Sequence, residues 1–344
     1  MIHSHISDAI KQPHIVHLGK NLYVARFESM KIYSTLAAVK SLLEQNLINQ
    51  QDTLLDSSSG IYAYALALAC NKYSLKCHII ASKTVDPVLK LQLELLGAIV
   101  EPAKSAPNLK MDQQNRVERI QQILMQRSDV HWMQQYHDDI HYLGYQEFAK
   151  VIAKNFSAQK LTLVGGVGSG CSTGATAQYL RAMDKDLTLH GVQPFGSITF
   201  NSSHVEDPDI IIAGIGSSIE FKNVRAEFYD YIHWISFDYS RNGVIELLKK
   251  HGVFAGLSAG ACYTVANGFA ASLDEQQPCI FIAADMGHRY FEPVFQTYQQ
   301  AKPVSELFPI TINKIDDLKL DWCVMPWHRQ PFNKPINQAE AIVE

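Results

Sequence analysis

The sequence predicts an α/β protein with a mostly parallel sheet and helices on both faces. Short apolar segments of strand length alternate with helical segments along most of the chain. Glycine- and serine-rich turns follow several of the strands, at the sheet edge where parallel α/β proteins place their functional loops. At 344 residues the chain can form one large domain or two lobes.

The expected strands are short runs rich in β-branched and aromatic residues. Residues 22–27 alternate, whereas residues 279–283 are apolar throughout, as in a strand covered on both faces. The full set covers residues 22–27, 53–55, 76–81, 98–100, 131–133, 161–164, 187–192, 233–237 and 279–283.

The expected helices show apolar residues at a spacing of three or four. Asp86 and Pro87 form a strong helix start, and Gly97 ends that helix. The helix after Lys31 has Leu36, Val39, Leu43 and Leu47 on one face. The other helices cover residues 61–70, 87–96, 113–127, 142–155, 175–183 and 241–250, and one more ends at residue 266.

A glycine-rich stretch, residues 164–174, lies between a buried strand and a helix. Such a turn offers backbone N–H groups and a positive helix end to a phosphate, and Ser169, Ser172 and Thr173 add hydroxyl donors. A tight turn without a ligand is the alternative for this motif taken alone. Neither nucleotide motif fits well. A Walker loop would need a lysine after Gly174, where this chain has Ala175, and a dinucleotide site would need an acidic residue at the end of the next strand, where it has Gln193.

Composition excludes several classes of function. The net charge of −4 gives no basic field for nucleic acid, and no apolar run is long enough to span a membrane. No signal peptide is recognisable at the N-terminus. The six cysteines form no CxxC pair, so we expect reduced, mostly buried thiols in a cytoplasmic protein. Two close histidine pairs occur without a HExxH pattern, so no metal site is expected: His3 with His5, and His137 with His141.

Taken in order, several turns resemble motifs of the fold-type II pyridoxal-phosphate enzymes, the group of cysteine synthase and cystathionine β-synthase. The resemblance covers roughly residues 15 to 295. Its motifs are Ser58-Ser59-Gly60, Gln134-Gln135-Tyr136, Gly168-Ser169-Gly170-Cys171-Ser172, Gly256-Leu257-Ser258-Ala259-Gly260-Ala261 and Gly287-His288-Arg289-Tyr290. A weaker likeness, in residues 196–200 and 214–217, points to the subgroup that makes diaminopropionate precursors.

The resemblance implies a role for each motif. Lys31 is the lysine expected to hold pyridoxal 5'-phosphate covalently and to act as general base. Residues 168–172 are expected to bind the phosphate, and a side chain at Gly170 would crowd its approach. Ser258 is the expected partner of the pyridine nitrogen. The expected substrate-binding residues are Ser58, Ser59, Gly60, Gln135, Gly214 and Gly216.

The family also implies a tryptophan synthase β-like architecture of two lobes and a homodimer. We expect residues 1–40 and 145–302 to form the large cofactor-binding lobe and residues 41–144 the smaller mobile substrate lobe. Residues 303–344 then form a C-terminal extension that is rich in proline.

Two departures from the family pattern concern the cofactor directly. The Asn-Pro-x-Gly-Ser run that usually precedes the lysine is shortened, because only Ser29 and Met30 separate Glu28 from Lys31. Ile61 stands where the family has an asparagine that contacts the ring oxygen. Isoleucine has no donor for that oxygen and makes the pocket more apolar.

The predicted function is β-replacement on an activated L-serine such as O-acetylserine or O-phosphoserine, with sulfide or an amine as nucleophile. The neutral Ser258 hydroxyl favours this over transamination, because it does not force the ring nitrogen to stay protonated. The alternatives are β-elimination, as in a dehydratase or desulfhydrase, and an impaired partner or regulatory subunit. A nucleotide-binding protein is a more distant alternative.

Overall fold

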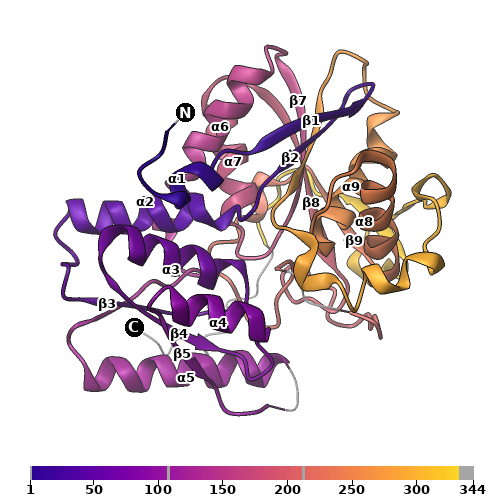
Figure 1. The fold of residues 1–344 in the computed structure, drawn as a ribbon. Coiled ribbons are helices and arrows are strands. Elements are labelled where there is room, and N and C mark those ends of the chain that lie inside the picture. Colours follow the sequence, from indigo (N-terminus) through magenta and orange to yellow (C-terminus); the bar gives the residue numbers. More distant parts are fainter. Residues whose placement is uncertain (1, 107–108, 211–213, 333–344) are drawn as a thin grey trace.

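The computed structural model describes residues 2–106, 109–210 and 214–332 and confirms the α/β prediction (Figure 1). Its strands are β1 (His14–Gly19), β2 (Leu22–Arg26), β3 (Thr53–Ser57), β4 (Lys76–Ala81), β5 (Ile99–Pro102), β6 (Val130–Trp132), β7 (Lys160–Gly166), β8 (Asp186–Pro194), β9 (Tyr231–Ile235), β10 (Cys279–Ala283), β11 (Ile310–Thr311) and β12 (Trp322–Pro326).

The helices fill most of the connections between strands. They are α1 (Ile6–Ile10), α2 (Lys31–Glu44), α3 (Ile61–Tyr73), α4 (Pro87–Leu95), α5 (Leu109–Gln126), α6 (Tyr145–Asn155), α7 (Cys171–Ala182), α8 (Phe237–His251) and α9 (Leu257–Ala270). Two short 3-10 helices also matter for the site, η1 (Asp139–Tyr142) and η3 (Gly287–Tyr290). Within the described residues, no helix is both long and apolar enough to cross a membrane.

Two sheets form the centres of two lobes. The larger sheet has eight strands in the order β1-β2-β10-β7-β8-β9-β12-β11, and the smaller has four in the order β5-β4-β3-β6. All pairs in the smaller sheet are parallel, as are the pairs from β2 through β9 in the larger one. The carboxyl ends of these strands therefore meet at common edges, where the predicted turns lie.

Alternating side chains explain why helices cover both faces of the small sheet. Leu54 and Ile79 pack with α2, α3 and α4 on one face, while Leu55 and Ile80 pack with α5 on the other. All four of these side chains are fully buried. A strand covered on both faces needs apolar residues at consecutive positions, as Leu54-Leu55 in β3 and Ile79-Ile80 in β4 provide.

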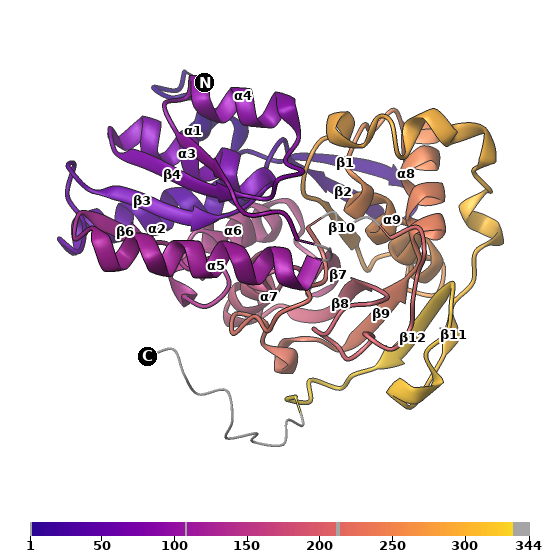
Figure 2. The ribbon, with the colours of Figure 1, turned by 90° about the horizontal axis from the view of Figure 1, so that it is seen from below.

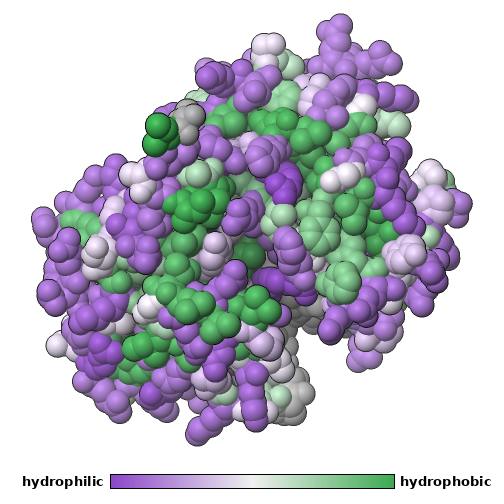
Figure 3. Space-filling model, in the orientation of Figure 1, coloured by the Kyte–Doolittle hydropathy of each residue, from purple (hydrophilic) through white to green (hydrophobic). Residues whose placement is uncertain are grey.

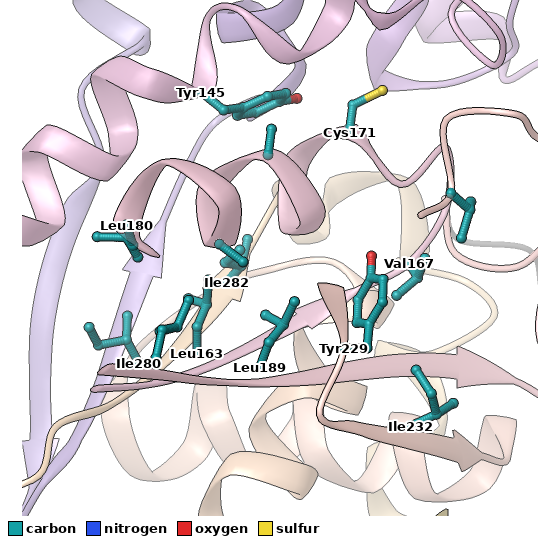
Figure 4. Close-up of a cluster of buried hydrophobic side chains, with 14 of the residues drawn as sticks. Tyr145, Leu163, Val167, Cys171, Leu180, Leu189, Tyr229, Ile232, Ile280 and Ile282 are labelled. Atoms are coloured by element: carbon teal, nitrogen blue, oxygen red, sulfur yellow. The ribbon is translucent and has the colours of Figure 1, made fainter. Parts of the chain in front are cut away.

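The large sheet follows the same rule. Leu163 and Ile280 face α6 and α7, whereas the next residues along, Val164 and Phe281, face α9. Figure 4 shows part of the first cluster, with Leu180 of α7 over side chains from the central strands. Burial on both faces fixes the register of these strands, and with it the positions of the turns that follow them.

A cleft separates the two lobes. In Figure 1 the small sheet with α2 to α5 lies on one side and the large sheet with α6 to α9 on the other, and Figure 3 shows the surface hollowed between them. Figure 2, viewed from below, shows α5 running along the outside of the small sheet. The proposed lobe boundary after residue 40 falls inside α2, whose buried side chains pack with α3 in the small lobe.

Three features differ from the sequence-based expectation. Strand β1 was not predicted and pairs antiparallel with β2 at the sheet edge. The segment after residue 302 is not only irregular, because β12 pairs antiparallel with β9 and extends the large sheet (Figure 2). Leu47, expected on the buried face of the helix after Lys31, lies beyond the end of α2 and is exposed. Residues 211–213 and 333–344, part of two predicted segments, lie outside the described residues.

Candidate active site

One cavity of about 460 Å³ lies in the cleft between the lobes. Its volume is in the range of small-ligand sites. Most of the residues proposed from the sequence line it: Lys31, Ser58, Ser59, Gly60, Ile61, Gln135, Gly168, Ser169, Ser172, Gly214, Gly216 and Ser258. They come from turns at the ends of several strands, brought together by the parallel pairing of those strands. Gly170 and Cys171 are not among the lining residues.

Lys31 is the first residue of α2 and points into this cavity. Its Nζ donates a hydrogen bond to Ser169 Oγ at 2.9 Å, which joins the lysine to the glycine-rich turn. Burial lowers the pKa of Lys31 below its ordinary value, against the attraction of the nearby Asp56 carboxylate. A lysine with a lowered pKa is neutral, and so nucleophilic, for a larger fraction of the time.

The glycine-rich turn leads directly into the N-terminus of α7. No side chain caps this helix end, so its first N–H groups remain available to an anion. Backbone packing explains Gly168, since a Cβ there would lie 2.2 Å from the carbonyl oxygen of Gly214. The loop at residues 214–218 thus packs on the turn, and Gly216 N donates to Val167 O at 2.8 Å.

Backbone geometry requires a glycine at position 170. Its φ is +83°, and a Cβ would lie 2.4 Å from the carbonyl oxygen of Asn223. Protein backbone therefore already excludes a side chain at Gly170, and the predicted contact of this residue with a phosphate stays a prediction. Cys171 is buried beneath the turn, and its thiol lies 3.9 Å from the carbonyl oxygen of Gln135. Burial raises the pKa of Cys171, which keeps the thiol protonated.

The loop before α3 is held by a buried carboxylate. Asp56 accepts hydrogen bonds from the N–H groups of Ser57 at 2.7 Å and Gln135 at 3.0 Å, and from Trp132 Nε1. Gln135 Nε2 in turn donates to Ser57 O at 2.8 Å. Burial raises the pKa of Asp56 to about 6 despite these donors. The two predicted substrate-binding segments, at residues 58–60 and at Gln135, are thereby fixed to each other.

Sequence reasoning missed a buried ion pair in the cavity wall. Arg116 on α5 pairs with Asp112 at 3.0 Å and donates to Ser57 Oγ at 3.1 Å. Both charged residues line the cavity and are buried. The sequence did contain a signal for this arginine, because it lies on the apolar face of its helix. Arg116 is one turn before the buried Ile120 and two turns before the buried Ile123.

A second group of polar residues follows β10 on the opposite wall. Asp285, Arg289 and Tyr290 line the cavity, and Tyr290 OH donates to Asp285 Oδ2 at 3.4 Å. Burial raises the pKa of Asp285 to about 6, against the attraction of Arg289. Asp285 Oδ1 is buried without a hydrogen-bond partner among the described residues.

Several hydrogen bonds join the two lobes. Ser218 Oγ of the large lobe donates to Gln113 Oε1 on α5 at 2.6 Å. Arg289 Nη2, also of the large lobe, donates to the carbonyl oxygen of Ser59 at 3.3 Å. Asn223 adds further links, because its side-chain amide donates to the carbonyl oxygens of Gln135 and Asp138. The cleft is therefore bridged by hydrogen bonds at several points.

The two departures noted in the sequence meet at one point of the cavity. Ser29, in the shortened loop before Lys31, donates through Oγ to the carbonyl oxygen of Ile61 at 3.4 Å. Ile61 and Met30 both line the cavity. The apolar side chains of Met30 and Ile61 thus share the cavity wall with Lys31.

Comparison with known proteins agrees with this arrangement. The family model described as "Pyridoxal-phosphate dependent enzyme" matches residues 8–285. N-(2-amino-2-carboxyethyl)-L-glutamate synthase of Cupriavidus metallidurans is 26% identical over 266 residues, which cover 75% of this chain and 76% of that protein. The enzyme of the same name from Ralstonia nicotianae is 25% identical over 313 residues, or 86% of this chain and 90% of that protein.

Solved structures show the same fold. The O-acetylserine dependent cystathionine β-synthase of Helicobacter pylori superposes with a TM-score of 0.75 at 22% identity, over 85% of this chain and 98% of that one. O-acetylserine sulfhydrylase isoform 3 of Entamoeba histolytica gives a TM-score of 0.78 at 15% identity, over 88% and 94% of the two chains. The family match spans most of the residues that build the cavity, and the fold is that of the cysteine synthases. The chain therefore belongs to the family of pyridoxal-phosphate dependent enzymes.

Proposed function

We propose that this enzyme catalyses β-replacement on an activated L-serine, with the amine of an amino acid as the nucleophile. The C–O bond from Cβ to the leaving group breaks, a C–N bond forms at the same carbon, and the amine loses a proton. The observation that carries the proposal is that Lys31 lies 2.9 Å from Ser169 of the phosphate turn in a cavity also lined by the buried Arg116.

The residues of the cavity fit pyridoxal phosphate. Its reactive aldehyde and its phosphate arm are on neighbouring ring carbons, so the lysine and the phosphate site must be adjacent, as Lys31 and Ser169 are. The uncapped N-terminus of α7 supplies the N–H donors that a phosphate needs. Ser258, which lines the cavity at the start of α9, would meet the ring nitrogen. When bound, the cofactor supplies an electron sink that makes the substrate Cα–H acidic.

Lys31 would perform the proton transfers. Its lowered pKa permits a covalent bond to the cofactor aldehyde and, once displaced by substrate, removal of the α-proton by Nζ. The hydrogen bond from Nζ to Ser169 Oγ would position the amine for both steps. Burial in the cavity also limits the access of water to the reacting carbon.

The N-terminus of α3 would bind the α-carboxylate of the donor. Gly60 precedes this helix and no side chain caps it, so the first N–H groups of α3 remain available. Ser58 and Ser59 add hydroxyl donors, and the Gln135 amide holds the loop through Ser57 O. These contacts would orient the Cα–H bond toward Lys31.

Arg116 would bind an anionic leaving group. A buried guanidinium in the cavity wall favours a phosphate over a neutral acetyl group, because charge-assisted contacts contribute about 1.5–3 kcal/mol each. We therefore propose O-phosphoserine rather than O-acetylserine as the preferred donor. Arg116→Gln is expected to lower kcat/KM for O-phosphoserine by more than tenfold and to change kcat/KM for O-acetylserine by less than threefold.

The choice of an amine over sulfide is supported by the relatives. Both are named for a product in which a 2-amino-2-carboxyethyl group is attached to glutamate. The bridged cleft supports replacement over β-elimination, because a closed site protects a reactive intermediate from water. The second candidate function is that of a catalytically impaired partner or regulatory subunit, and it is supported by Ile61 and the shortened loop before Lys31.

The test uses the purified holoenzyme with O-phosphoserine or O-acetylserine, and with L-glutamate or sulfide. Mass spectrometry of the mixture is expected to find the N-linked product with O-phosphoserine and glutamate. Pyruvate without any coupled product would instead identify β-elimination. No turnover of either donor with either nucleophile would contradict the proposal and favour the regulatory role.

A further inference from the structure

Arg289 is a cation in the cavity wall that the proposed reaction leaves without an anion. It lies on η3, after β10 of the large lobe, and is half-buried. The Asp285 carboxyl attracts it electrostatically, but among the described residues no carboxylate oxygen lies within 4.0 Å of its guanidinium nitrogens, whereas Arg116 pairs with Asp112 at 3.0 Å. A guanidinium taken out of water costs free energy unless an anion or several acceptors compensate it.

The position of the guanidinium is fixed by the loop before α3. Nη2 donates to Ser59 O at 3.3 Å, and Nη1 lies 3.2 Å from the point where Gly60 would carry a Cβ. Nε is buried and has no hydrogen-bond partner among the described residues. The arginine thus lines the cavity at the junction of the two lobes with its hydrogen-bonding capacity only partly used.

The anionic groups of the donor substrate already have other partners in the proposed function. The α-carboxylate is assigned to the N-terminus of α3 and the leaving group to Arg116 on the small lobe. Arg289 reaches the same loop from the opposite lobe. A ligand that enters after the leaving group has departed would meet this guanidinium at the other wall of the cavity.

We infer that Arg289 binds a carboxylate of the amino-acid nucleophile and so selects amines that carry a carboxylate. This inference rests on the proposed function, and it makes Arg289 a specificity residue for the second substrate. The planar guanidinium can offer paired N–H donors to a carboxylate, a geometry that lysine cannot reproduce. Sulfide has no carboxylate and cannot use the contact.

The experiment compares holoenzyme variants with O-phosphoserine as donor and three nucleophiles: L-glutamate, propylamine and sulfide. Arg289→Gln is expected to raise KM for glutamate by about ten- to a hundredfold, the effect of one lost charge-assisted contact. Because Arg289 also contacts Ser59 O, some change with sulfide or propylamine is expected, but the rise in KM for glutamate should exceed it at least tenfold. Arg289→Lys retains the charge and is expected to show a smaller rise in KM for glutamate.

Two controls separate this role from a structural one. Arg119→Gln removes an arginine that pairs with Glu101 on the small lobe and does not line the cavity, and it is expected to behave as wild type. The donor half-reaction is followed through the absorbance of the bound cofactor without nucleophile, and in Arg289→Gln its affinity is expected to change by a much smaller factor than the KM for glutamate. If Arg289→Gln does not fold, the rise in KM for Arg289→Lys decides the question.

The inference is overturned if both variants use glutamate with the KM of wild type, or if donor affinity falls by the same factor as glutamate affinity. A wild-type enzyme that couples sulfide but no amino acid would overturn the proposed function itself, and this inference with it. These outcomes are distinct, because the first two appear only in the variants.

Discussion

Replacing Gly170 by alanine tests the structural basis of the phosphate turn. The φ of +83° is costly for any residue with a Cβ, by about 1–2 kcal/mol. The new Cβ would also lie 2.4 Å from Asn223 O and 2.7 Å from Val224 Cα, both backbone atoms that cannot rotate away. Overpacking of this kind adds about 1–3 kcal/mol. We therefore expect a total loss of about 2–5 kcal/mol, shared between unfolding free energy and cofactor binding.

The displaced segment explains why cofactor binding should suffer. Asn223 links the turn to the opposite wall through hydrogen bonds to Gln135 O and Asp138 O, and Tyr142 OH donates to Asn223 O at 2.6 Å. Moving Asn223 would therefore shift the turn and the Gln135 segment together. Gly170→Val is expected to have a larger effect, because a β-branched residue is still less compatible with a positive φ.

Urea unfolding and cofactor occupancy after dialysis measure the two parts of the effect. Gly174→Ala is the matched control: it lies within α7, and its Cβ would meet only side-chain atoms, at 3.2 Å or more. We expect the control to retain cofactor and to unfold within about 1 kcal/mol of wild type. A Gly170→Ala protein that matches the control in both assays would refute the reasoning.

Two further predictions concern the pocket and the large sheet. Ile61→Asn supplies a hydrogen-bond donor for the ring oxygen, so in an active enzyme it should shift the preference between O-acetylserine and O-phosphoserine. The absorbance of the cofactor after mixing with each donor measures this preference. An unchanged preference would exclude Ile61 as a determinant of donor choice. Unfolding free energy should fall as pH decreases from about 6.5 toward 4, because burial lowers the pKa of His190 to about 4 and the unfolded chain then binds more protons. His190 contributes up to about 3 kcal/mol of this loss. In urea titrations at pH 7.5 and 5, the unfolding free energy of His190→Gln should therefore differ less between the two pH values than that of wild type. An equal difference in the two proteins would contradict the prediction.

The positions of most strands and helices followed from the sequence because both sheets are covered on both faces. Continuous apolar runs such as residues 279–283 and helix signals such as Asp86 are local, and the structure keeps them: Asp86 accepts a hydrogen bond from Leu89 N at the start of α4. The turns that line the cavity could also be foreseen, since parallel strands place their carboxyl ends at one edge.

What the sequence did not reveal depends on contacts between distant segments. Arg116 became a candidate only once α5 was seen to face Ser57, and Arg289 only once η3 was seen to reach Ser59. β12 was missed because its pairing with β9 joins segments about 90 residues apart. The close approach of Asn223 O to Gly170 was not foreseen for the same reason, since Asn223 is remote in the chain.

Identifying the residue that carries the cofactor tests the central claim most directly. Reduction of the holoenzyme with borohydride, followed by proteolysis and mass spectrometry, would fix the cofactor to its lysine. We predict the pyridoxyl group on Lys31, and its absence in a Lys31→Ala protein that remains folded by circular dichroism. Modification of a different lysine, or a label that persists in Lys31→Ala, would contradict this account of the active site.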